Sequence, residues 1–255
     1  MKVLRVRHAD QTFYAQLLPE KNAVVCLDQS LGLTDPVPLG ELAVLPPLSP
    51  SKVVCVLDNY RSRLEQEGRQ APEAPRLFLR PPTAVVGIGQ HIVLPRGVSR
   101  VAPGGELAVI IGRACRHITP EAVPAYLFGY SCANGLMAPD LLAQDGCPGR
   151  AAGFDGFAAV GPWIETAVAD PAALPLRTLR NGQPVQEGTT ADMVFAPLDL
   201  VSRITSVMTL LPGDVVLTGT PAGGEPLAAG DELRVEIADV GVLINTVVAE
   251  PETLQ

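Results

Sequence analysis

The sequence predicts a mainly β fold of the α+β class. The 24 glycines and 25 prolines among 255 residues are numerous enough to divide the chain into short strands and turns, since both residue types interrupt helices. Apolar residues make up 47% and charged residues 18% of the chain, a balance that allows a sizeable core and excludes intrinsic disorder. We therefore expect packed β-sheets with few peripheral helices.

The first part of the chain predicts a small β domain. Leu4 and Val6 alternate with Arg5 and Arg7, the pattern of a half-buried strand. Short apolar runs follow over 13–17 and 23–27, and a Pro-rich junction ends the region over 45–51. We predict an N-terminal β appendage over residues 1–47 and a larger domain over residues 48–255.

Apolar runs predict the strands of the larger domain. In residues 232–237, Leu233, Val235 and Ile237 alternate with charged residues, which indicates a strand with one face in water. Asn181-Gly182 joins two extended runs, and this dipeptide accepts positive φ at both positions of a tight hairpin. Further strands are predicted over 53–57, 77–79, 107–111, 215–217 and 242–244.

Two helices are predicted, both on the outside of the sheets. One begins at the cap Thr119, with Pro120 at its first position, and covers about 119–129. The other covers 198–211 and ends at Pro212-Gly213. Its apolar face is predicted to comprise Leu200, Val201, Ile204, Val207, Met208 and Leu211.

Charge and hydropathy argue against two classes of partner. The net charge of −8 is spread without basic blocks, so we expect no nucleic acid to bind. The longest charge-free stretch, residues 122–139, is interrupted by Pro and Gly and is too polar to cross a bilayer. The N-terminus lacks the apolar run of an export signal. We expect no membrane segment and a cytoplasmic location.

The five cysteines contain no Cys-x-x-Cys pair, which fits neither a disulfide framework nor a zinc site. Cys147, in a Gly/Pro-rich loop, is a possible nucleophile, but no histidine lies near it in the sequence. We interpret the cysteines as small buried residues.

Short motifs follow one another in a fixed order between residues 50 and 248. They lie at 51–56, 59–60, 77–83, 105–112, 129–130, 153–157, 181–182 and 212–223. In this order they resemble the fumarylacetoacetate hydrolase family. The resemblance implies a mixed β-roll in the larger, catalytic-type domain, usually dimeric, that acts on 2-oxo or enol dicarboxylic acids with Mg²⁺ or Mn²⁺.

The resemblance also implies a metal site of three carboxylates, of which this sequence keeps one. Glu106 matches, whereas Gly104 and Gly135 stand at the positions of the other two acids. A hard cation held by one carboxylate and water binds weakly, so we expect neither Mg²⁺ nor Mn²⁺ to be bound by this chain. Two questions stay open: whether Glu106 is a residual contact or a solvated strand end, and whether an acid takes over a lost ligand position. The candidates for that replacement are Asp58, Asp140 and Asp155.

Other positions of the family pattern also differ. Arg63 stands where the family has His, about Gln66 where it has Glu, and Ala152 where it has Lys, so no catalytic residue is assigned. Arg80 replaces a Lys before Pro-Pro. Guanidinium and hydroxyl groups bind carboxylates, and the resemblance places the 218–221 segment at the substrate pocket. We predict four substrate-binding residues: Arg63, Arg80, Thr218 and Thr220.

Three details resemble the N-terminal half of the two-part isomerase/decarboxylase of homoprotocatechuate (4-hydroxyphenylacetate) degradation: Arg61-Ser62 after the Asn-Tyr pair, the absence of paired glutamates, and Pro139-Asp140. This resemblance implies an isomerase, decarboxylase or C–C hydrolase of 2-oxo or enol dicarboxylates. The alternative is a non-catalytic subunit that partners an intact paralogue, which the missing acids favour. In either case we expect a homodimer or a hetero-oligomer with a paralogous subunit.

Overall fold

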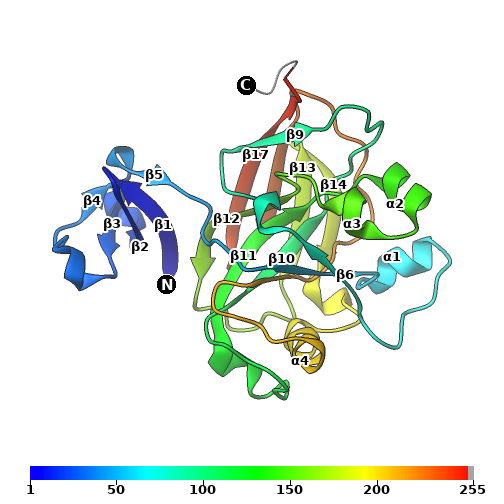
Figure 1. Ribbon diagram of the computed structural model, residues 1–255, viewed down its shortest axis with the longest axis horizontal. Coiled ribbons are helices and arrows are strands. Elements are labelled where there is room, and N and C mark those ends of the chain that lie inside the picture. The colour runs from blue at the N-terminus through cyan, green and yellow to red at the C-terminus, as the bar shows by residue number, and fades with distance from the viewer. Residues whose placement is uncertain (252–255) are drawn as a thin grey trace.

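The computed structural model describes residues 1–251, which form β-strands and four short α-helices (Figure 1). The strands are β1 (Lys2–His8), β2 (Gln11–Leu18), β3 (Ala23–Cys26), β4 (Val37–Pro38), β5 (Ala43–Val44), β6 (Val53–Leu57), β7 (Arg76–Arg80), β8 (Val85–Val86), β9 (His91–Leu94), β10 (Gly105–Ile111), β11 (Leu127–Gly135), β12 (Ala158–Glu165), β13 (Pro175–Arg180), β14 (Gln183–Thr189), β15 (Val215–Leu217), β16 (Glu232–Ile237) and β17 (Gly241–Ala249). The helices are α1 (Arg61–Gln66), α2 (Pro139–Asp145), α3 (Pro148–Ala152) and α4 (Pro197–Val207).

The strands form two mixed sheets, which confirms the predicted mainly β fold. The larger sheet has twelve strands in the order β4-β3-β2-β1-β12-β11-β10-β15-β6-β7, with β5 beside β1 and β8 beside β12. The smaller sheet has five strands in the order β14-β13-β16-β17-β9. Three pairs are parallel, namely β6 with β15, β8 with β12 and β9 with β17, and the other pairs are antiparallel.

The main core lies between the two sheets. Leu107 and Val109 of β10 pack in one apolar cluster with Leu176, Val235 and Leu243 of the smaller sheet. The intervening residues of β10 point to the opposite face of the larger sheet and join a second cluster. Because β10 is buried on both faces, its residues are apolar without alternation. The one charged residue of this strand, Glu106, lies near its start and is buried like its neighbours.

The N-terminal strands lie to one side of the body (Figure 1) and have a small core of their own, which includes Leu4, Val6 and Phe13. Strand β1 nevertheless pairs with β12 of the body, with Lys2 opposite Glu165. The larger sheet thus runs on into the N-terminal strands, and the domain boundary near residue 47 stays a prediction.

The hairpin and the one-sided strand are as predicted. Asn181 and Gly182 have φ of 52° and 77° between β13 and β14. In β16, Leu233, Val235 and Ile237 are buried, and the charged residues between them are more exposed.

The helix predicted over 119–129 is wrong. A 3-10 turn covers only Val123–Tyr126, and Leu127 already begins β11. Pro120 and Pro124 lie within five residues, and each removes a backbone donor, so no α-helical ladder forms. Three helices that were not predicted, α1, α2 and α3, have only five to seven residues each, too few to show a helical period.

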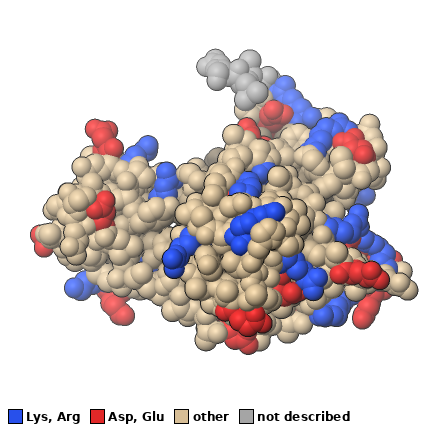
Figure 2. Space-filling model, turned by 60° about the horizontal axis from the view of Figure 1, so that its bottom comes forward, with Lys and Arg blue, Asp and Glu red and all other residues tan. Residues whose placement is uncertain are grey.

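The second predicted helix is confirmed as α4, with a correction to its face. Leu200, Val201 and Ile204 are buried, whereas Val207 is 61% and Leu211 is 42% exposed. The helix ends at Val207 and Met208 is extended, so Leu211 is not on the helix at all. Among the described residues, no helix is long and apolar enough to cross a membrane. On the face shown in Figure 2, acidic and basic side chains are interspersed.

Candidate active site

A cavity of about 480 Å³ lies where β10 begins, β11 ends and the chain leaves β15. It brings together four of the residues singled out from the sequence, namely Arg63, Arg80, Glu106 and Thr220. Antiparallel pairing places Glu106 opposite Ala133 in β11. The register of β10 with β15 then carries Gly219, just beyond β15, to the level of Glu106. Residues distant in the sequence therefore meet at one end of the larger sheet.

Glu106 is buried, with 5% of its surface exposed, so it is not a solvated strand end. Its Oε2 accepts a hydrogen bond of 2.6 Å from the Gly219 N–H. Burial raises the pKa of Glu106 to about 7, although Arg80, the Gly219 N–H and Arg63 favour the charged form. The carboxyl group is anchored at one oxygen and faces the cavity.

The free oxygen of Glu106 takes the space beside Gly135. A Cβ at residue 135 would lie 2.1 Å from Glu106 Oε1 and 3.2 Å from Arg80 Nη2. A Cβ at Gly104 would lie 2.7 Å from the Gly135 carbonyl oxygen. The two positions that carry acids in the family pattern are therefore closely packed by their neighbours, and neither has room for a carboxylate in this arrangement.

Arg80, at the end of β7, is only 2% exposed. Its Nη1 donates to the carbonyl oxygens of Leu136, Ala152 and Phe157 at 2.7, 2.9 and 2.8 Å. Its Nε has no partner, and no carboxylate of the described residues forms an ion pair with it. The guanidinium is thus a buried cation that is fixed by neutral groups.

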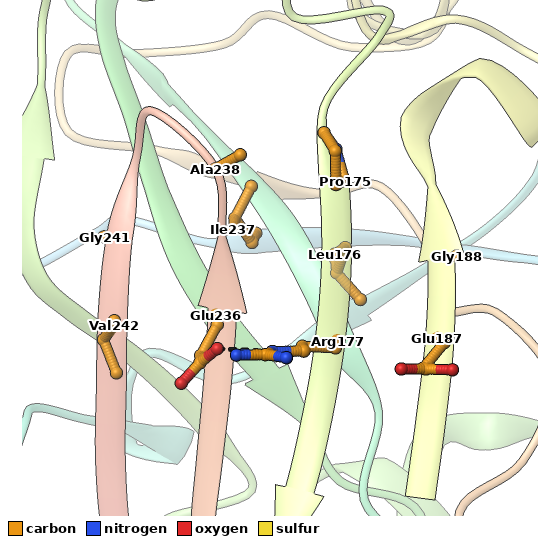
Figure 3. A pocket seen from close by; sticks show the side chains of 10 residues that line it. All are labelled: Pro175, Leu176, Arg177, Glu187, Gly188, Glu236, Ile237, Ala238, Gly241 and Val242. Carbon is orange, nitrogen blue, oxygen red and sulfur yellow. Dashed lines mark hydrogen bonds and ion pairs between the residues drawn. The ribbon is translucent and has the colours of Figure 1, made fainter. Parts of the chain in front are cut away.

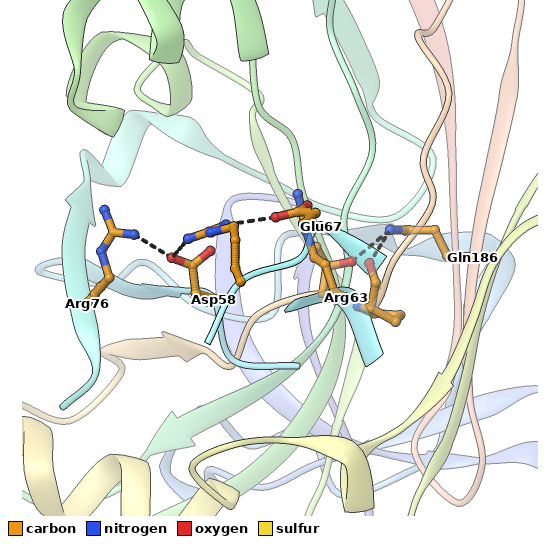
Figure 4. A network of polar contacts seen from close by, with 8 residues as sticks. Asp58, Arg63, Glu67, Arg76 and Gln186 are labelled. Atoms are coloured by element: carbon orange, nitrogen blue, oxygen red, sulfur yellow. Dashed lines mark hydrogen bonds and ion pairs between the residues drawn. The ribbon is translucent and has the colours of Figure 1, made fainter. Parts of the chain in front are cut away.

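An ion-pair network forms the outer wall of the cavity (Figure 4). Asp58, which has a left-handed φ of 62°, pairs with Arg69 and, at 2.5 Å, with Arg76. Glu67 pairs with Arg69 at 2.7 Å and with Arg63 at 3.0 Å. These pairs tie α1 and the segment after it to β7. Each of the three arginines of this wall, Arg63, Arg69 and Arg76, is therefore paired with at least one carboxylate.

The cavity is cationic although the chain is acidic. Five arginines line it against the two carboxylates of Asp58 and Glu106, while the whole chain carries −8. The fifth arginine, Arg100, lies 3.8 Å from Asp140, a loose pair. A concave site lined by one sign of charge concentrates ligands of the opposite sign, so the cavity favours a small anion.

Thr220 and Thr218 have different environments. Thr220 lines the cavity, and its Oγ1 accepts a bond of 3.0 Å from Gln186 Nε2. Thr218 is fully buried and donates to the Leu107 carbonyl oxygen at 2.9 Å. The structure does not bring Thr218 to the cavity. Asn59 holds this segment in place, since its Nδ2 donates to the Thr218 carbonyl oxygen at 2.8 Å.

The residues present do not fit the metal site implied by the family. Within residues 1–251, no three His, Cys, Asp or Glu side chains converge as a ligand set. Asp58 is held by Arg69 and Arg76, Asp140 accepts a bond from Ser99, and Asp155 is exposed. None of these aspartates takes a lost ligand position beside Glu106.

A second cavity, of about 490 Å³, is a shallow depression over β13, β14, β16 and β17 (Figure 3). Its polar side chains are Arg177, Glu187 and Glu236, and Arg177 pairs with Glu236 at 2.5 Å. This cavity brings no unpaired cation together with a buried acid, so the arginine-lined cavity is the candidate active site.

Sequence reasoning missed several lining residues. Arg69, Arg76 and Arg100 were not singled out, because Arg69 and Arg100 lie in irregular segments and their convergence depends on the tertiary structure. Gln186 does not line the cavity itself, but it was also missed, and it bridges Thr220 and the Gly105 N–H. Its place in the strand after the Asn-Gly hairpin is the one local signal that pointed there.

Comparisons with known proteins identify the family and the fold of this chain. The family model "Fumarylacetoacetate (FAA) hydrolase C-terminal" matches residues 52–248. A 4-hydroxyphenylacetate degradation bifunctional isomerase/decarboxylase from Salmonella dublin is 36% identical over 208 residues, which cover 80% of this chain and 48% of that protein. The chain therefore spans about half of that relative.

Solved structures cover nearly the whole chain. A 5-carboxymethyl-2-hydroxymuconate delta-isomerase from Mycobacterium smegmatis superposes with a TM-score of 0.89 at 36% identity, covering 99% of this chain and 100% of that one. A maleylpyruvate hydrolase from Sphingobium sp. SYK-6, solved with manganese(II) and pyruvate, gives a TM-score of 0.81 at 27% identity, covering 98% of this chain and 100% of that one.

Proposed function

Because the chain belongs to the fumarylacetoacetate hydrolase family, we propose that it acts as an isomerase or decarboxylase on a small 2-oxo or enol dicarboxylate. Such compounds arise in the degradation of aromatic compounds such as 4-hydroxyphenylacetate, the route named for one relative. The observation that carries the proposal is the cavity itself, in which a buried carboxyl group, Glu106, faces a surplus of arginines.

The two kinds of side chain have separate tasks in this proposal. Arginines bind the substrate carboxylates through charge-assisted hydrogen bonds. Glu106, held at Oε2 by the Gly219 N–H, uses Oε1 to move a proton between the enol oxygen and carbon of the bound substrate. In isomerisation the O–H bond breaks and a C–H bond forms, so no net proton is gained. In decarboxylation the C–C bond breaks, CO₂ leaves, Glu106 protonates the enolate carbon, and Glu106 regains its proton from the solvent.

The test is turnover of 2-hydroxyhepta-2,4-diene-1,7-dioate, followed by loss of the dienol absorbance with EDTA present. We expect the wild-type chain to accelerate the isomerisation and Glu106→Gln to lower kcat by about 100-fold or more, the usual size of a general acid–base contribution. Glu67→Gln, which alters an acid of the outer wall, is the matched control and should retain most activity. Equal rates for the wild type and Glu106→Gln would contradict the role of Glu106.

The missing acids at Gly104 and Gly135 favour a second candidate, a non-catalytic subunit that pairs with an intact paralogue. A non-catalytic subunit differs from an active enzyme in one measurable way: the isolated chain is inactive on every dicarboxylate. Addition of a relative that keeps all three acids would then give a stable hetero-oligomer. The competing assembly is a homo-oligomer of this chain, as the family resemblance implies. Sedimentation velocity distinguishes the homo-oligomer from the hetero-oligomer.

A further inference from the structure

We propose that Arg80 is the built-in cation of the active site, and that it binds the planar carboxylate end of a 2-oxo acid without a divalent metal. The inference rests on the proposed function for its choice of ligand class.

Arg80 is fixed before any ligand arrives. Three carbonyl oxygens accept from Nη1, and they hold the plane of the guanidinium. Phe78 packs with its ring centroid 5.5 Å from the Arg80 Cζ. A fixed donor loses little conformational entropy on binding a ligand. The rest of the guanidinium is therefore positioned as a rigid fork.

Arg80 forms no ion pair with a carboxylate of the described residues, and burial raises the pKa of the nearby acid, Glu106, to about 7. Within residues 1–251, Nε has no hydrogen-bond partner. The neighbouring Cys55 thiol cannot supply a negative charge, because burial raises its pKa to about 12, although the charge of Arg80 opposes this shift. A buried charge without a partner is unfavourable, and a ligand carboxylate in the cavity supplies that partner.

Arg80 and Glu106 line the same cavity, so a carboxylate bound there meets both side chains. A planar 2-oxo carboxylate has adjacent oxygens that match the parallel N–H groups of a guanidinium. Its carbon chain then passes Glu106, the proposed proton carrier. One cation thus both neutralises the acid group and orients the reacting carbon.

The test is calorimetric titration of the whole chain with sodium oxalate, which presents two adjacent planar carboxylates and is not turned over. We expect oxalate to bind when EDTA is present. In a second titration, with MnCl₂ in place of EDTA, we expect the affinity for oxalate to change less than twofold. Failure of the wild type to bind oxalate, or binding only with Mn²⁺, would overturn the proposal.

Two variants locate the site. Arg80→Lys keeps a positive charge but loses the fork, and we expect at least a tenfold weaker affinity. Arg177→Lys, which lies outside this cavity and is paired with Glu236, should stay within threefold. Because Arg80→Lys removes bonds to three carbonyls, its fold is checked by circular dichroism.

Glu106→Gln is a nearly isosteric substitution, and its oxalate affinity gives a second test. It should bind oxalate as tightly as the wild type or more tightly, because it removes a competing acid. If oxalate bound through a metal ion, the loss of the Glu106 carboxylate would weaken oxalate binding. Weaker oxalate binding by Glu106→Gln would therefore refute the role of Arg80. If the protein turns over the dienoate but binds oxalate only with Mn²⁺, the role of Arg80 is wrong and the proposed function stands. If it binds oxalate without metal but shows no turnover, the proposed function is wrong and the role of Arg80 stands.

Discussion

Glu106 and Gly135 are mutually dependent: the Oε1 atom of Glu106 lies 2.1 Å from where a Cβ on residue 135 would be. The glutamate can adopt its position because residue 135 has no side chain. Residue 135, predicted to stand at the position of an acid in the family pattern, thus leaves as glycine the space that Glu106 uses.

Gly135→Asp should destabilise the protein and should not create a metal site. The new side chain must displace Glu106 or strain β11, and overpacking of a closed site costs about 1–3 kcal/mol. Urea unfolding measures the loss, with Gly149→Ala as control, since nothing lies within 4 Å of a Cβ there. Wild-type stability combined with tight Mn²⁺ binding would show that the two acids can coexist.

Asn59→Ala should lower the free energy of unfolding by about 3 kcal/mol, because buried groups lose their hydrogen-bond partners. Asn59 Nδ2 donates to the carbonyl oxygens of Phe195 and Thr218, and its Oδ1 accepts from the Phe195 N–H. These bonds connect the end of β6, the start of α4 and the end of β15. The exposed Gln183→Ala is the comparison, and similar losses in both variants would contradict the anchoring role.

Asp214 should contribute stability that disappears in acid. Burial alone would raise the pKa of Asp214, but bonds from Lys52, Ser51 and the Leu211 N–H outweigh burial and hold it below its ordinary value. A lowered pKa in the folded state means that the contribution is present above about pH 4, the unfolded value, and is lost as the pH falls through the folded value.

The measurement compares the wild type with Asp214→Asn in chemical unfolding. We expect the variant to be less stable by about 2 kcal/mol at pH 7, as for a lost hydrogen bond to a charged group. The difference should be smaller at pH 3, which lies below the unfolded value of the aspartate pKa. An equal difference at both pH values would show that the ionised form of Asp214 is not what stabilises the fold.

Those parts of the fold that have a local signal were predictable from the sequence. The alternation in β16 and the Asn-Gly hairpin are set by neighbouring residues, so both were predicted correctly. Strands β11 and β12 were missed, because they are buried along most of their length and rich in Gly and Ala, which gives no alternation to detect. The start of β11 was instead assigned to a helix.

The candidate site was predictable only in part, for a related reason. Glu106, Arg63, Arg80 and Thr220 stand in motifs whose order is visible in the chain. The direction in which each side chain points depends on the tertiary structure, so Thr218 was grouped with Thr220 although its hydroxyl bonds to Leu107. Arg100 lies in an irregular segment and carries no motif.

Arg100→Gln should separate dicarboxylates from monocarboxylates. If Arg80 binds the 2-oxo acid end, a second carboxylate needs another cation in the same cavity. Arg63, Arg69 and Arg76 are already paired with carboxylates within 3.0 Å, whereas Arg100 has only the pair with Asp140 at 3.8 Å. Arg100 is thus the arginine of the outer cavity that is most available to a ligand.

Titration with 2-oxoglutarate and with 2-oxobutyrate, both with EDTA present, measures this. We expect Arg100→Gln to weaken 2-oxoglutarate about tenfold, since a hydrogen bond to a charged group contributes roughly 1.5 kcal/mol or more, and to change 2-oxobutyrate less than twofold. Arg63→Gln serves as the comparison, because its predicted role in binding competes with its pair to Glu67. A selective loss for 2-oxoglutarate in Arg63→Gln, with none in Arg100→Gln, would assign the second carboxylate to Arg63. Equal losses for both ligands in Arg100→Gln would mean that this arginine attracts anions in general and does not select the dicarboxylate.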